Sequence, residues 1–132
     1  MNLSKVRLST IVQIPNQKMY TEKCIVNMVE KCNIRIKDKR MFILNGYPND
    51  NTINVCSTGI LVDKCIYKDE RLEIEGTFFD TPGGRMSQGI LETNRFDIVP
   101  NILGVITDGT IENCDIMSFS INAGEPSEHR FK

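Results

Sequence analysis

The chain has 132 residues, 40% of them hydrophobic, which fits one domain with one core. Its 16 basic and 17 acidic residues give a formal net charge of −1, so the composition offers no positive surface for polymeric nucleic acid or an anionic membrane. No apolar run is long enough to span a bilayer, and the N-terminus lacks the apolar core of a signal peptide, so we expect a cytoplasmic protein.

The first third of the chain predicts a strand followed by a helix. In KVRLSTIVQI (residues 5–14) apolar residues alternate with more polar ones, which is the period of a half-buried strand, and Pro15 ends it. After Thr21, a good N-cap, four side chains at helical spacing share one face of a short amphipathic helix: Ile25, Met28, Val29 and Cys32. We expect this helix to lie on the sheet.

The middle of the chain predicts a β-hairpin. After the apolar run MFIL and the turn-rich loop LNGYPNDN (44–51), strand character resumes over 54–67, where three side chains should share one face: Ile60, Val62 and Ile66. A turn at 68–70 then leads into a return strand, 71–79, with Leu72, Ile74 and Phe78 on its apolar face.

A second short helix is predicted from the stretch DTPGGRMSQGIL. Asp80 or Thr81 serves as the N-cap, Pro82 occupies the first helical position, and the helix ends near Leu91.

The last third predicts a second hairpin, with its turn at Asp108-Gly109. The strand after it is indicated by apolar residues that alternate with serines: Met117, Phe119 and Ile121 with Ser118 and Ser120. Residues 125–132 form a polar tail that we expect to be loose, which leaves residues 1–124 as the single domain.

Six or seven strands and two short helices, joined mostly by hairpins, predict an α+β domain with a mostly antiparallel sheet or small barrel. A parallel doubly wound fold would need more helix. Strand edges such as residues 3–14 could pair between copies, so a homo-oligomer stays open as an alternative.

The cysteines do not form a recognisable site. There are five, without a C-x-x-C spacing and with one histidine in the chain: Cys24, Cys32, Cys56, Cys65 and Cys114. This pattern argues against a zinc site and against a disulfide framework, so we expect reduced, mostly buried thiols and no metal or cofactor.

Candidates for nucleophilic catalysis are few. A serine or cysteine nucleophile needs a base beside it, usually a histidine, and the chain offers only His129, in the polar tail. A solvated His129 is the simpler interpretation, and Ser118 and Ser120 fit the alternation of the last strand. Paired acidic residues on the return strand are typical of a solvated strand face.

The stretch DTPGGRM is compatible with an anion site. A helix N-terminus presents free amide N–H groups, two glycines permit close approach, and Arg85 adds a positive charge. Asp80 is itself an anion at this terminus, and Thr-Pro is an ordinary helix start, so a purely structural role is the competing interpretation. The stretch does not match the phosphate-binding G-x-x-x-x-G-K-[ST] pattern.

The landmarks follow one another in a particular order along the chain: IPNQKMY, TEKCIVNMVEKC, NGYPN, GILVDKCIYKDERLEIEGTFF, DTPGGRMSQGIL, ILGVI and IENCDIMSFSINAGEPS. In this order, over about residues 6–127, the sequence resembles tailed-phage prohead (maturation) proteases. The resemblance implies an antiparallel β fold shared with herpesvirus assemblins and a phage origin. Members of that family use a histidine and a serine to cut scaffold and capsid proteins during head maturation.

The sequence departs from this family at both catalytic positions. The family's histidine lies in a His-Pro loop that aligns with Tyr47-Pro48, and its serine aligns with VPNILG, where the nearest polar residue is Asn101. A tyrosine, with a pKa near 10, cannot replace an imidazole base near neutral pH, and an asparagine is not a serine-type nucleophile. The resemblance therefore implies a degenerate, non-catalytic member of the family.

Three functions follow as hypotheses. In the first, a cleft floored by Tyr47, Asn101 and Ser118 and flanked by Arg85 or Arg95 holds a small anionic or nucleotide-like ligand, such as a host immune signal sequestered as an anti-defence measure. In the second, the protein binds phage capsid or scaffold protein during head assembly without cutting it.

In the third, it is a weakly active maturation protease that uses Ser118 or Ser120 with His129. In the first two it is not an enzyme. In all three it would work in the cytoplasm of the infected bacterial host, with association with the virion as an alternative.

Overall fold

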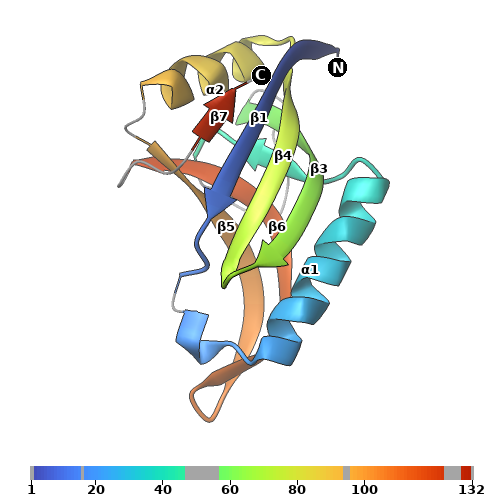
Figure 1. Cartoon of the computed structure of the whole chain (residues 1–132), viewed down its shortest axis with the longest axis vertical. Coiled ribbons are helices and arrows are strands. Elements are labelled where there is room, and N and C mark those ends of the chain that lie inside the picture. Colours follow the sequence, from blue (N-terminus) through green and yellow to red (C-terminus); the bar gives the residue numbers. More distant parts are fainter. Residues whose placement is uncertain (1, 16, 47–56, 94–95, 124–128, 132) are drawn as a thin grey trace.

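The computed structural model describes residues 2–15, 17–46, 57–93, 96–123 and 129–131 (Figure 1). Within these residues the elements follow in this order: β1 (Leu3–Val12), the 3-10 helix η1 (Gln17–Met19), α1 (Glu22–Lys37), β2 (Phe42–Leu44), β3 (Thr58–Lys68), β4 (Arg71–Phe79), α2 (Pro82–Glu92), β5 (Phe96–Thr107), β6 (Thr110–Ala123) and β7 (His129–Phe131).

The strands form one sheet in the order β5-β6-β2-β3-β4-β1-β7. All neighbours pair antiparallel except β2 and β6, which pair parallel, with Ile43 opposite Phe119. The predicted α+β fold with a mostly antiparallel sheet is therefore confirmed. The side chains of Ile43 and Phe119 are both buried in the hydrophobic core.

The β3–β4 hairpin forms as predicted, but the alternation along β3 changes halfway. The register with β4 shifts between Val62 and Lys64, so Asp63 is an extra residue in β3. After this bulge the side chain of Cys65 is buried in the core, at 3% exposed, whereas that of Ile66 is 38% exposed. The prediction that Ile66 shares the face of Val62 is therefore wrong, because the bulge interrupts the two-residue period.

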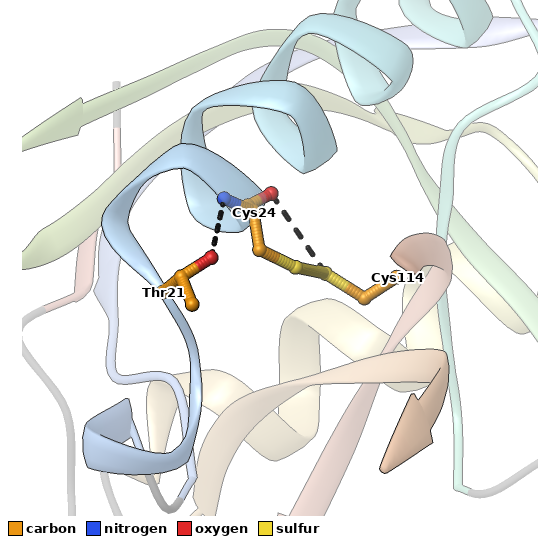
Figure 2. The surroundings of a disulfide bond; sticks show 3 residues. All are labelled: Thr21, Cys24 and Cys114. Carbon is orange, nitrogen blue, oxygen red and sulfur yellow. Dashed lines mark hydrogen bonds between the residues drawn. A yellow bond between two sulfur atoms is a disulfide. The ribbon is translucent and has the colours of Figure 1, made fainter. Parts of the chain in front are cut away.

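Helix α1 covers the sheet where β2 ends. Because β2 has three residues, β3 and β6 are left without a strand between them over most of their length, and α1 packs against both (Figure 1). The helix begins as predicted, since the Thr21 side chain accepts a hydrogen bond from the Cys24 amide at 3.1 Å (Figure 2). Met28 lies on its fully buried face, and Arg35 near its C-terminus pairs with Asp115 of β6 at 2.6 Å.

A disulfide between Cys24 and Cys114 links the first turn of α1 to β6 (Figure 2). Their Cα atoms are 6.6 Å apart, although the residues are separated by 90 positions in sequence. The prediction of reduced thiols is therefore wrong for this pair, since sequence spacing does not show which helix and strand positions meet. Cys32 and Cys65 are free, buried and hydrogen-bonded to each other, and Cys56 lies outside the described residues.

Helix α2 starts where the sequence predicts. The Thr81 side chain accepts a hydrogen bond from the Gly84 amide at 3.1 Å, and Pro82 occupies the first turn. Of the helices in the described part of the chain, none combines the length and the apolar character that crossing a bilayer requires.

The C-terminal residues extend the sheet. Residues 129–131, expected to be loose, form β7 and pair antiparallel with β1, with His129 opposite Thr10. The polar composition of this segment did not indicate a strand, because main-chain hydrogen bonds to an open sheet edge require no apolar side chain.

Candidate functional site

A buried polar cluster joins β5 and β6 at Asn101, the position that aligns with the catalytic serine of prohead proteases. Asn101 pairs across the ladder with Ser118, and its side-chain amide donates to the hydroxyl of Ser118 at 2.9 Å and of Ser120 at 2.7 Å. Ser118 is 3% exposed and Ser120 is fully buried. Asn101 and Ser118, two of the predicted site residues, are therefore brought together.

Among the described side chains, the group that hydrogen-bonds to both serines is the amide of Asn101. A serine nucleophile needs a group that removes its proton, and neither atom of an amide takes up a proton near neutral pH. No imidazole or carboxylate among the described side chains hydrogen-bonds to Ser118 or Ser120. The cluster instead satisfies buried polar atoms and fixes the register of β5 on β6.

A second polar cluster holds the start of the loop that contains Tyr47. The Asn45 amide donates to the carbonyl of Ser57 at 2.7 Å, which closes the loop at its two ends. The Asn45 side chain donates to the carbonyl of Gly83 at 3.0 Å and accepts from the Ser87 hydroxyl at 2.5 Å. Neither Asn45 nor Ser87 was a predicted site residue, and the one available signal in the sequence was an asparagine directly before a glycine at a strand end.

The two clusters share one end of the sheet. Leu44, the last residue of β2, pairs with Ser120 of β6, and Asn45 follows it directly. Of the other predicted site residues, Tyr47 and Arg95 lie outside the described residues.

Arg85, a predicted site residue, lies on the surface beside Asp80. Its guanidinium pairs with the Asp80 carboxylate at 3.2 Å, and both side chains are exposed. The glycines of this stretch are buried against the sheet, and a Cβ atom on Gly84 would overlap the main-chain carbonyl of Phe79. Likewise, a Cβ on Gly59 of β3 would overlap Ser87. These glycines therefore permit close contact between α2 and the sheet, which favours the structural interpretation of DTPGGRM over an anion site.

An open groove of about 960 Å³ lies elsewhere, between the start of α1 and the β3–β4 turn. Its walls carry two tyrosines, Tyr20 and Tyr67, and the Tyr67 hydroxyl accepts a hydrogen bond from Gln17 at 3.0 Å. Burial raises the pKa of Tyr20, so its ring stays uncharged at neutral pH. The charged lining residues balance: Lys18, Lys68 and Arg71 against Glu22, Asp69 and Glu70.

Over the described residues, no group of three histidine, cysteine, aspartate or glutamate side chains is placed to hold a metal ion.

The fold is similar to that of a known phage enzyme. The structure of the bacteriophage T4 capsid assembly protease, gp21, matches with a TM-score of 0.62 over 92% of this chain and 80% of that chain, at 14% sequence identity. No protein-family model matches the sequence, and no curated protein matches it either. The similarity confirms the prohead-protease-like fold that the sequence resemblance implied.

Proposed function

We propose that the chain is a non-catalytic phage protein that binds capsid or scaffold polypeptide during head assembly, on a fold of the prohead-protease type. The observation that carries the proposal is the Asn101 amide, which hydrogen-bonds to both buried serines at the position of the expected nucleophile. Neither hydroxyl has a base beside it among the described side chains. A fold that has lost its chemistry can still recognise the polypeptides that its active relatives cut.

The similarity to the T4 capsid assembly protease supports the choice of partner. The match covers 92% of this chain and 80% of that chain, so the two share the fold over most of their lengths. A protein with this role would act in the cytoplasm of the infected host, during the time when proheads assemble.

Binding without cleavage can be tested with purified partners. The protein would be mixed with the scaffold and major capsid proteins of its own phage, and both binding and cleavage would be followed, by sedimentation with proheads and by mass spectrometry of the partners. We expect binding and intact partners. A double variant, Ser118→Ala with Ser120→Ala, should bind equally well, because both serines are buried and do not contact a partner.

Two outcomes would count against the proposal. If the partners are cleaved and the double variant abolishes cleavage, the protein is a protease. If neither protein binds, at concentrations reached late in infection, the assembly role fails.

A small nucleotide-like ligand is the second candidate, favoured by the groove at the start of α1. Its two tyrosine rings can stack on a base, and its lysines can contact a phosphate, although three acidic residues nearby favour a ligand of low net charge. Native mass spectrometry of the freshly purified protein would show a co-purified molecule. Loss of that molecule in Tyr67→Ala, but not in Arg85→Ala, would assign it to this groove rather than to the predicted cleft.

A further inference from the structure

The far half of β5 exposes several apolar side chains. Leu103, Val105 and Ile106 are 52%, 60% and 63% exposed, and the β5–β6 hairpin that carries them projects beyond the rest of the molecule (Figure 1). Single exposed apolar side chains are common on soluble proteins, but three neighbours on one short segment are a typical feature of an interaction surface.

Among the described strands, this half of β5 is also an open sheet edge. β5 is the first strand in the sheet order, so on its outer side no strand of the described chain pairs with it. Protected edges carry charged residues, prolines or bulges, and the segment 101–107, NILGVIT, has none of these. The two irregularities in the β5–β6 pairing each place the extra residue on β6, so β5 itself remains regular and able to accept another strand.

The segment 101–107 is complementary to itself. In an antiparallel pair of two copies, with a two-fold axis through Gly104, Leu103 lies opposite Val105 of the second copy and Ile102 lies opposite Ile106. Asn101 lies opposite Thr107, and no charged residue falls within the paired segment.

The limits of the segment are symmetric as well. Pro100, which has no N–H to donate, lies just before it, and the turn residue Asp108 lies just after it. At the axis, glycine lies opposite glycine, so no side chains compete for space there. An unrelated strand would have no reason to match both the apolar pattern and the limits, whereas a second copy does so by symmetry.

We propose that two copies of the chain associate through β5, forming an antiparallel pair over residues 101–107 that continues the sheet of one copy into that of the other. This association is independent of what the fold binds, so the proposed function can fail while the dimer stands.

Sedimentation equilibrium across a concentration series tests the association. We expect a reversible monomer–dimer equilibrium in the parent protein. Val105→Lys would place one lysine against Leu103 at two symmetric positions and lower the association constant by roughly tenfold or more. The matched control is Ile34→Lys on α1, where the side chain is similarly exposed, at 61%, but lies off the edge, and it should leave the association unchanged.

The register is tested by cysteine crosslinking. A mixture of Leu103→Cys and Val105→Cys chains should form a disulfide between positions 103 and 105 of different copies, because directly opposite residues on paired strands lie within disulfide distance. Leu103→Cys alone should crosslink much less, since its two copies lie diagonally. Crosslinked peptides would be identified by mass spectrometry.

Either of two results would overturn the proposal. One is a protein that stays monomeric at all concentrations up to about 0.5 mM, where even weak association would be visible. The other is a dimer that Val105→Lys and Ile34→Lys affect equally, or in which positions 103 and 105 do not crosslink. Circular dichroism of both lysine variants would show that each is folded, so that a lost dimer cannot be attributed to unfolding.

Discussion

A methyl group added at Gly84 should destabilise the protein, whereas one added at Gly89 of the same helix should stabilise it. A Cβ on Gly84 would overlap the Phe79 carbonyl oxygen and lie 2.7 Å from its carbon and 3.0 Å from its nitrogen. Ordinary contacts are about 3.5–4.0 Å, so α2 would have to move from β4 by on the order of 1 Å. The obstacle is main chain, which cannot turn aside as a side chain can.

The size of the effect follows from two opposing contributions. Overpacking of this kind costs about 3 kcal/mol, and the better helix propensity of alanine returns about 1 kcal/mol, which leaves a loss of about 2 kcal/mol in the free energy of unfolding. At Gly89 a Cβ meets nothing within 4 Å, so Gly89→Ala keeps only the gain of about 1 kcal/mol.

Thermal unfolding followed by circular dichroism would measure both variants. At this chain length 1 kcal/mol corresponds to about 4 °C, so we expect Tm to fall by about 8 °C for Gly84→Ala and to rise by about 4 °C for Gly89→Ala. Shifts of the same sign, or a Gly84→Ala protein as stable as the parent, would refute the close packing of α2. The glycines would then be free for another role, such as the approach of a ligand.

Three further predictions concern Asn101, the disulfide and the Cys32 thiol. Asn101→Ala leaves the two serine hydroxyls without their donor, and we expect a loss of about 1–3 kcal/mol in urea denaturation; an unchanged midpoint would show that the cluster is not a structural element. Cys114→Ala removes the disulfide that closes a long loop, so it should cost about 2–5 kcal/mol and abolish the effect of a reductant on Tm, whereas the parent should lose stability when reduced. The hydrogen bond with Cys65 and burial raise the pKa of Cys32 above its ordinary value of 9.0. Above about pH 9 the unfolded chain therefore loses a proton that the folded state keeps. The free energy of unfolding should fall as the pH rises through this range. In Cys32→Ala that decline should be shallower by up to about 1.4 kcal/mol per pH unit, and an identical decline in both proteins would contradict the assignment.

Local signals in the sequence predicted the elements well where each depends on neighbouring residues. Thr81 and Pro82 start α2 through the hydrogen bond and backbone angle that these residue types supply. The apolar spacing after Thr21 likewise identified the buried face of α1, including Met28 and Cys32.

What the sequence did not predict depends on residues far apart in the chain. The bulge at Asp63 became visible only through the register of β3 against β4, and the aspartate is held there by Arg7 of β1 at 2.7 Å. The candidate site was half predicted: Asn101 and Ser118 do meet, but Asn45 joins the neighbouring cluster through Ser87 of α2, 42 positions away. No periodicity in a single segment reports such a contact.

The short parallel pair of β2 and β6 has a consequence for how the chain folds during synthesis. The β3–β4 hairpin and its pairing with β1 need only residues up to Phe79, so they can form early. β2 and α1 can join this hairpin through β3, but their other partner strand, β6, follows much later in the sequence. A nascent chain therefore carries a partly uncovered apolar helix face until β6 has left the ribosome, and we expect chains that stop before β6 to depend on chaperones.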